Sequence, residues 1–150
     1  MAGEVRELGE LKIVGVELPN ADPRAHLILY LWGKLAARMP EVEGPIDPHI
    51  LYGVWHRKGR TTPSYILGVQ VSAVGVLPEG LVSVHVPAYR YGTVTLKGAP
   101  DFGRAYEQLE RYIKANHREL VPADATVEIY DTRQEVSDEY TVTLCQPICH

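Results

Sequence analysis

The order of apolar and polar positions divides the chain into seven short strands and two helices. Apolar, β-branched runs predict strands at 11–18, 49–56, 65–73, 81–86, 89–96, 125–131 and 139–146. Apolar positions at helical spacing predict helices up to Met39 and over about 102–119. The first helix is expected to begin at Asp22, with Pro23 in its first turn. A polar hairpin is expected at 57–63.

The unit β-α-β-β occurs twice in this order of elements. Strands of the first unit align with strands of the second at nearly constant spacing, which indicates a duplicated unit. The chain is therefore predicted to be one α+β domain over residues 1–150, with pseudo-repeats at about 10–75 and 88–148. Each repeat would form one antiparallel sheet half with one helix, and the halves would enclose a groove. The alignment makes Tyr52 and Glu128 equivalent and places both on the sheet face away from the helices.

Composition narrows the classes of function. A chain of 150 residues suits one domain, and its net charge of −4 argues against direct binding to nucleic acid or to an anionic membrane. No apolar run is long enough to span a membrane, and no secretory signal is recognisable, so a cytoplasmic protein is expected. The cysteines, Cys145 and Cys149, are expected to be reduced thiols. The histidines lack metal-binding spacing, so neither a metal nor a cofactor is predicted.

Candidate chemistry is concentrated in the strand at 125–131. Side chains alternate along a strand, so Glu128 and Tyr130 project to the same side. A carboxylate beside a phenol can bind a cation or move a proton. The alternative is a solvated glutamate, or one paired with Arg90 or Arg133. Nine tyrosines against one phenylalanine favour an amphipathic pocket over a purely apolar core.

Short segments in a fixed order give the chain a family resemblance. They are Trp32, Tyr52-Gly53-Val54-Trp55, Tyr65 with Gly68-Val69-Gln70-Val71, Pro78-x-Gly80-Leu81, Val86-Pro87-Ala88, Tyr91-Gly92-Thr93-Val94, Lys97-Gly98, Val127-Glu128-Ile129-Tyr130-Asp131 and Pro147-Ile148. In this order and spacing they resemble the GyrI-like small-molecule-binding family. That family includes the effector-binding domains of AraC- and MerR-type multidrug regulators and also stand-alone proteins.

The resemblance implies a duplicated α+β domain with a central, aromatic-lined cleft and an acidic residue that pairs with cationic compounds. Glu128 is the residue that matches. The ligand-binding residues expected from the resemblance and the alternation together are Glu128, Tyr52, Tyr91, Tyr130, Trp32 and Tyr65. Trp55 alternates to the face opposite Tyr52 and is assigned to the core, while Trp32 also fits a core position. The family often has acidic residues where this chain has Gln70, Thr141 and Thr143, so Glu128 is expected to be a lone carboxylate.

Two functions from different classes follow. The favoured one is binding, without catalysis, of an amphipathic aromatic small molecule, for which a positive charge is compatible but not required. The alternative is a hydrolase of reactive xenobiotics, such as cyclopropane- or ester-type electrophiles. Glu128 would then act as base or nucleophile, and Tyr130 or Tyr91 would donate a hydrogen bond or a proton to the leaving group. The resemblance also admits a protein partner, either a separate regulator or DNA gyrase.

Overall fold

The computed structural model describes residues 3–18, 28–56, 64–97, 102–116, 125–132 and 141–148. Within them lie eight strands, two α-helices and one short 3-10 helix. The strands are β1 (Gly3–Leu8), β2 (Leu11–Leu18), β3 (Ile50–His56), β4 (Ser64–Gln70), β5 (Val82–Val86), β6 (Tyr89–Lys97), β7 (Ala125–Asp131) and β8 (Thr141–Pro147). The helices are α1 (Ile28–Arg38), η1 (Met39–Glu41) and α2 (Phe102–Ala115).

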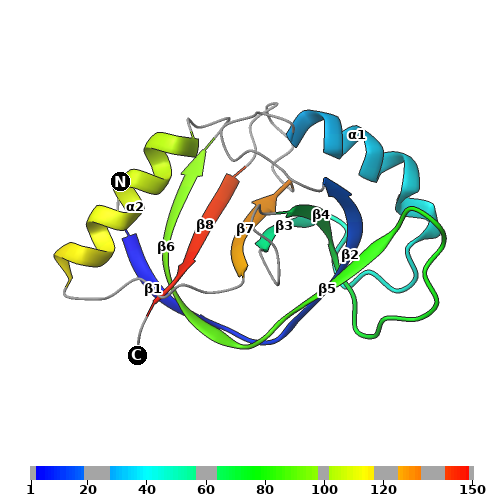
Figure 1. Cartoon of the computed structure of the whole chain (residues 1–150), viewed down its shortest axis with the longest axis horizontal. Helices are drawn as coiled ribbons and strands as arrows, with labels where there is room; N and C mark the ends of the chain where they lie inside the picture. The colour runs from blue at the N-terminus through cyan, green and yellow to red at the C-terminus, as the bar shows by residue number, and fades with distance from the viewer. Residues whose placement is uncertain are drawn as a thin grey trace.

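All eight strands form one curved antiparallel sheet in the order β1-β6-β8-β7-β3-β4-β2-β5 (Figure 1). The predicted α+β class is confirmed, and the two expected sheet halves are continuous. Strands β3 and β7 join them at the centre, where Tyr52 pairs with Ile129 and Gly53 with Glu128. Outward from this seam the two halves have matching strand orders. The repeat boundaries at 10–75 and 88–148 stay a prediction.

Both helices cover the same face of the sheet, one over each half (Figure 1). Helix α1 packs against β2 and β4, and α2 packs against β6 and β8. Their buried leucine and isoleucine side chains share one apolar core with the sheet; these are Leu31 and Leu35 from α1, and Leu109 and Ile113 from α2. Aliphatic side chains at helical spacing thus attach each helix to its own half.

The opposite face is partly covered by a long two-stranded ribbon. In one half of the sheet the ribbon consists of β1 paired with β6, and in the other half it consists of β2 paired with β5. It crosses from one half to the other between the residue pairs Leu8–Tyr89 and Leu11–Val86. The ribbon runs beneath the central strands, along the lower side of the view in Figure 1. A second, smaller core lies there, around Val54, Val127 and Cys145, with side chains of the ribbon packed against it.

The predicted strands agree closely with those of the structure, with one exception. Strand β1 was not predicted, because the sequence GEVREL has charged residues at three of six positions. It lies at the edge of the sheet, where most of its side chains face water. Helix α2 ends at Ala115 rather than near residue 119. The expected start of the first helix at Asp22 and the hairpin at 57–63 lie outside the described residues. Within those residues, no helix is long and apolar enough to cross a membrane.

Candidate functional site

The side chain of Glu128 is buried on the helix-covered face of the sheet. Strand β7 pairs Glu128 with Gly53 on one side and with Leu144 on the other, so these three residues project to the same face. Only 1% of Glu128 is exposed. Burying a carboxylate is costly unless hydrogen bonds replace the lost water.

Four aromatic side chains supply those hydrogen bonds. The Oε1 atom of Glu128 accepts from the hydroxyl of Tyr65 at 2.9 Å and from that of Tyr130 at 2.7 Å. The Oε2 atom accepts from the hydroxyl of Tyr106 at 2.6 Å and from the indole nitrogen of Trp55 at 3.0 Å. A carboxylate has about four acceptor positions. All four are therefore occupied, by donors from β3, β4, β7 and α2.

The two oxygens of Glu128 have partners that differ in burial. Tyr65 and Tyr130, the partners of Oε1, are fully buried. Trp55 and Tyr106, the partners of Oε2, are only partly buried. The two partners of Oε2 are therefore less buried than the two partners of Oε1.

Aromatic packing holds the hydroxyl groups in place. Trp32 of α1 meets Tyr130 edge-on, with ring centroids 5.8 Å apart and planes at 89°. Trp55 lies on Tyr65 with centroids 4.6 Å apart. Such pairs stabilise beyond their buried area. Both helices thus reach the site, α1 through Trp32 and α2 through Tyr106.

A glycine makes room for one of the donors. Gly53 lies directly across the β3–β7 pair from Glu128. A Cβ atom at this position would lie 2.0 Å from the hydroxyl oxygen of Tyr65 and 2.7 Å from its Cζ atom. The absent side chain at position 53 therefore provides the path by which the Tyr65 hydroxyl reaches the carboxylate.

The tyrosines around Glu128 are held in the protonated form. Burial raises the pKa of each hydroxyl well above its usual value, and the nearby charge of Glu128 raises it further; this applies to Tyr65, Tyr106 and Tyr130. These hydroxyls therefore keep their protons and donate them in hydrogen bonds to Glu128.

No basic side chain of the described residues forms an ion pair with Glu128. Arg90, one of the two partners considered from the sequence, instead pairs with Glu7 at 2.6 Å. The other, Arg133, lies outside the described residues. Hydrogen bonds therefore solvate the buried carboxylate, while its negative charge has no cationic partner within those residues.

The structure overturns the expectation that Tyr52 and Glu128 share a face. Tyr52 pairs with Ile129, one position away from Glu128, and a shift of one residue moves a side chain to the other side of a sheet. The same parity places Tyr91, Gln70, Thr141 and Thr143 on the face away from Glu128. These positions therefore say nothing about charge next to Glu128, and the expected location of Glu128 away from the helices was wrong.

Of the residues expected at the site, the structure brings together Glu128, Tyr130, Tyr65 and Trp32. Trp55, which alternation with Tyr52 had assigned to the core, donates a hydrogen bond to Glu128. Tyr106 was not among the site residues expected from the sequence, although a tyrosine hydroxyl at an inward-facing helix position is a signal of a buried acceptor. Among the described residues, no three histidine, cysteine, aspartate or glutamate side chains gather as a metal ion would need.

The antiparallel sheet with two helices on one face is consistent with the fold of GyrI-like effector-binding domains. The model of the Cass2 family, described as integron-associated effector binding protein, matches residues 7–148, and the chain belongs to this family. The resemblance to GyrI-like effector-binding domains is confirmed with it.

Individual relatives agree with this assignment. The chain is similar to the transcriptional regulator BrlR of Pseudomonas aeruginosa, with 28% identity over 134 residues. That match covers 89% of this chain but 49% of BrlR, so the chain spans about half the length of that regulator. Among solved structures, SAV2435 bound to tetraphenylphosphonium has a TM-score of 0.73 at 18% identity and covers 99% of this chain and 94% of its own. The C-terminal domain of EcmrR has a TM-score of 0.70 at 14% identity, with coverages of 99% and 97%. These two structures share the fold.

Proposed function

We propose that this protein binds an amphipathic aromatic cation on the helix-covered face of the sheet, with Glu128 as the negative partner. One observation carries the proposal: a carboxylate that is 1% exposed is surrounded by aromatic side chains and forms no ion pair within the described residues. A ligand cation would supply the missing positive charge. SAV2435, which shares this fold, has been solved with tetraphenylphosphonium, an aromatic cation of this kind.

The occupied lone pairs of Glu128 indicate which cations suit the site. A primary ammonium ion needs acceptors for its N–H groups, and each acceptor position of Glu128 already has a donor. A permanent cation without N–H groups needs only proximity to the negative charge and to ring faces. Coulomb attraction at about 5 Å and an effective dielectric of about 20 amounts to about 3 kcal/mol. Each ring face adds about 0.5–2 kcal/mol.

The ligand would approach on the side of Oε2. Trp55 and Tyr106 are the partly exposed donors there, so their movement would open the carboxylate to a ligand while Tyr65 and Tyr130 still solvate Oε1. Indole fluorescence is sensitive to such a change because Trp55 contacts Glu128 itself.

The test is a fluorescence titration with tetraphenylphosphonium and with neutral triphenylphosphine oxide. The wild type should bind the cation more tightly, and Glu128→Gln should weaken cation binding about 100-fold, the equivalent of about 3 kcal/mol. Binding of the neutral compound should change little. Glu110→Gln, at an exposed position of α2, removes the same charge away from the site and should behave as the wild type. Equal binding of the cation by the wild type and Glu128→Gln would contradict the proposal.

The hydrolase alternative stays a prediction that the contacts of Glu128 do not favour. A base or nucleophile needs a free lone pair, and each acceptor position of Glu128 is in use, so one donor would have to leave first. Tyr91, one of the tyrosines considered for the leaving group, lies on the other face of the sheet. Product formed from a strained or ester substrate by the wild type but not by Glu128→Gln would reinstate it.

A protein partner also stays a proposal. BrlR is a transcriptional regulator about twice as long as this match, so a role in reporting ligand to a regulator is consistent with that similarity.

A further inference from the structure

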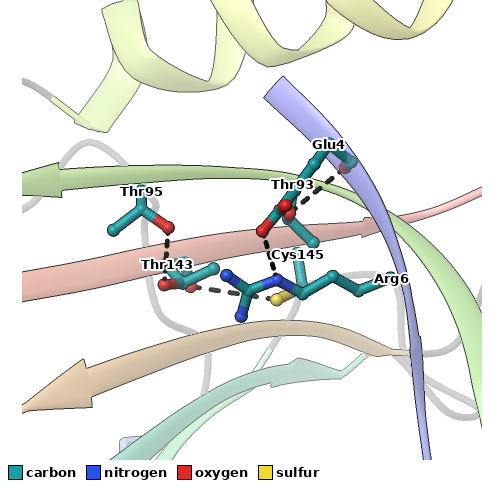
Figure 2. Close-up of polar contacts among 6 residues, drawn as sticks. All are labelled: Glu4, Arg6, Thr93, Thr95, Thr143 and Cys145. Atoms are coloured by element: carbon teal, nitrogen blue, oxygen red, sulfur yellow. Dashed lines mark hydrogen bonds and ion pairs between the residues drawn. The ribbon is translucent and has the colours of Figure 1, made fainter. Parts of the chain in front are cut away.

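The face of the sheet opposite Glu128 carries a positively charged side chain and hydrogen-bond donors. Arg6 of β1 extends across this face toward Thr143 and Cys145 of β8 (Figure 2). Its Nε atom lies 2.5 Å from Oε1 of Glu4, which fixes the guanidinium. The two terminal nitrogens of Arg6 form no hydrogen bond within the described part of the chain, and 43% of the side chain is exposed. They are therefore available to an acceptor from outside the protein.

Two threonine hydroxyls lie on the same face, on the side toward which Arg6 extends. Thr95 and Thr143 are directly paired across β6 and β8, and their hydroxyl oxygens are 3.0 Å apart (Figure 2). One hydroxyl donates to the other, so one hydroxyl hydrogen is left for a further acceptor. Together with the four hydrogens on the terminal nitrogens of Arg6, this makes a donor-rich cluster. Such clusters recognise carboxylate and phosphate oxygens.

An apolar row continues from these threonines across the sheet. The register places Thr143 beside Ile129, Ile129 beside Tyr52, and Tyr52 beside Gly68 on the same face. Ile129 and Tyr52 are only partly buried. The row ends at Gly68, which is buried, because a Cβ atom there would lie 2.3 Å from the carbonyl oxygen of Val14. The accessible part of the row is therefore formed by Ile129 and Tyr52. A flat apolar group could therefore lie along the row while an oxyanion meets Arg6.

From this juxtaposition we infer a second small-molecule site, for an amphipathic aryl or alkyl carboxylate. Arg6, Thr143 and Thr95 bind the oxyanion, and Ile129 and Tyr52 contact the apolar body. Arg6 is also near enough to Cys145 for its charge to lower the pKa of that buried thiol, although burial dominates and raises the pKa to about 12. The positive charge of Arg6 is thus directed at this face, and the protein offers separate faces to a cation and to an anion.

The experiment is calorimetric titration with sodium benzoate, with neutral benzamide and inorganic phosphate as comparisons. Benzoate should bind at least about tenfold more tightly than benzamide because only benzoate pairs with Arg6. Phosphate should bind more weakly than benzoate, since it cannot use the apolar row. Arg6→Gln should weaken benzoate about 10- to 100-fold and Thr143→Val severalfold, while Arg6→Lys should retain part of the affinity.

A matched control separates this site from a general charge effect. Arg90 of β6 forms an ion pair with Glu7 of β1 at 2.6 Å. In the register of these two strands Arg90 lies one residue from Tyr91, the partner of Arg6, so Arg90 projects to the other face of the sheet. Arg90→Gln and Glu128→Gln should each leave benzoate affinity within about twofold of the wild type. Failure of the wild type to saturate with benzoate would overturn the inference. The inference would also be overturned if Arg6→Gln and Thr143→Val kept full affinity for benzoate. It would be overturned too if Arg90→Gln lost as much affinity for benzoate as Arg6→Gln.

Discussion

Replacing Gly53 with alanine tests how tightly the carboxylate site is built. The added methyl group would lie 2.0 Å from the Tyr65 hydroxyl oxygen, whereas non-bonded atoms of this kind prefer about 3.5 Å. Tyr65 must therefore withdraw by more than the slack in its 2.9 Å hydrogen bond to Glu128. Overpacking costs about 1–3 kcal/mol, and a lost hydrogen bond to a charged group costs about 1.5–3 kcal/mol. We expect the free energy of unfolding to fall by about 3–5 kcal/mol.

The assay is urea unfolding followed by circular dichroism, with the midpoint and the slope both fitted. Gly33→Ala is the matched control, because a Cβ atom at this exposed helical position meets no atom within 4 Å. It should stabilise by about 0.5–1 kcal/mol through helix propensity. The double variant Gly53→Ala/Tyr65→Phe lacks the hydroxyl, which is the nearest clashing atom, although the ring carbon Cζ at 2.7 Å remains. The hydrogen bond to Glu128 is also lost only once, so the cost of the double variant should fall short of the sum of the single costs by more than about 1 kcal/mol. A loss below about 1 kcal/mol for Gly53→Ala, or strict additivity in the double variant, would refute the reasoning.

Three further predictions concern buried groups. Tyr65, Tyr106 and Tyr130 have raised pKa values in the folded protein, whereas unfolded tyrosines ionise near their usual pKa of about 10. Their contribution to the free energy of unfolding should therefore be fully present below about pH 10 and be lost above it, and the urea midpoint should fall between about pH 10 and 11 in the wild type by more than in Tyr106→Phe. Tyr106→Phe should cost about 1–2 kcal/mol in the same unfolding assay, because it removes the 2.6 Å bond to Oε2. In a Cys149→Ser background, the Cys145 thiol should react with a disulfide reagent only as fast as the protein opens. The reason is that Cys145 is fully buried and that burial raises its pKa to about 12. Rapid labelling of the native protein would contradict this prediction.

Most of the fold could be predicted because local patterns determine it. Alternating β-branched runs located seven of the eight strands, and apolar spacing located both helices. Strand β1 escaped because its charged residues carry no burial signal, and its place in the sheet depends on pairing with residues 89–94, far along the chain. Long-range pairing of this kind cannot be deduced from alternation.

The site was predicted in its centre but not in its surroundings. Glu128 and Tyr130 project together from one strand, a relation that alternation alone decides. The relation between Glu128 and Tyr52 depends on the register of β3 against β7, and the repeat alignment placed it one residue out. That single step exchanged Tyr52 for Trp55 as the neighbour of the carboxylate. The contact of Tyr106 with Glu128 could be predicted only from the position of α2 over the β3–β7 seam.

The ribbon beneath the sheet imposes an order of events on the newly made chain. Strand β1 is synthesised before its partner β6, which lies more than 80 residues further along the chain at 89–97. Until β6 has been made, β1 is an unpaired strand with hydrogen-bonding groups open to any neighbouring chain. Glu4, Arg6 and Glu7 keep it hydrated during this interval, since charged edge strands resist pairing with other chains. The charge pattern that leaves β1 without a burial signal in the sequence is thus also of the kind that disfavours pairing of an edge strand with other chains.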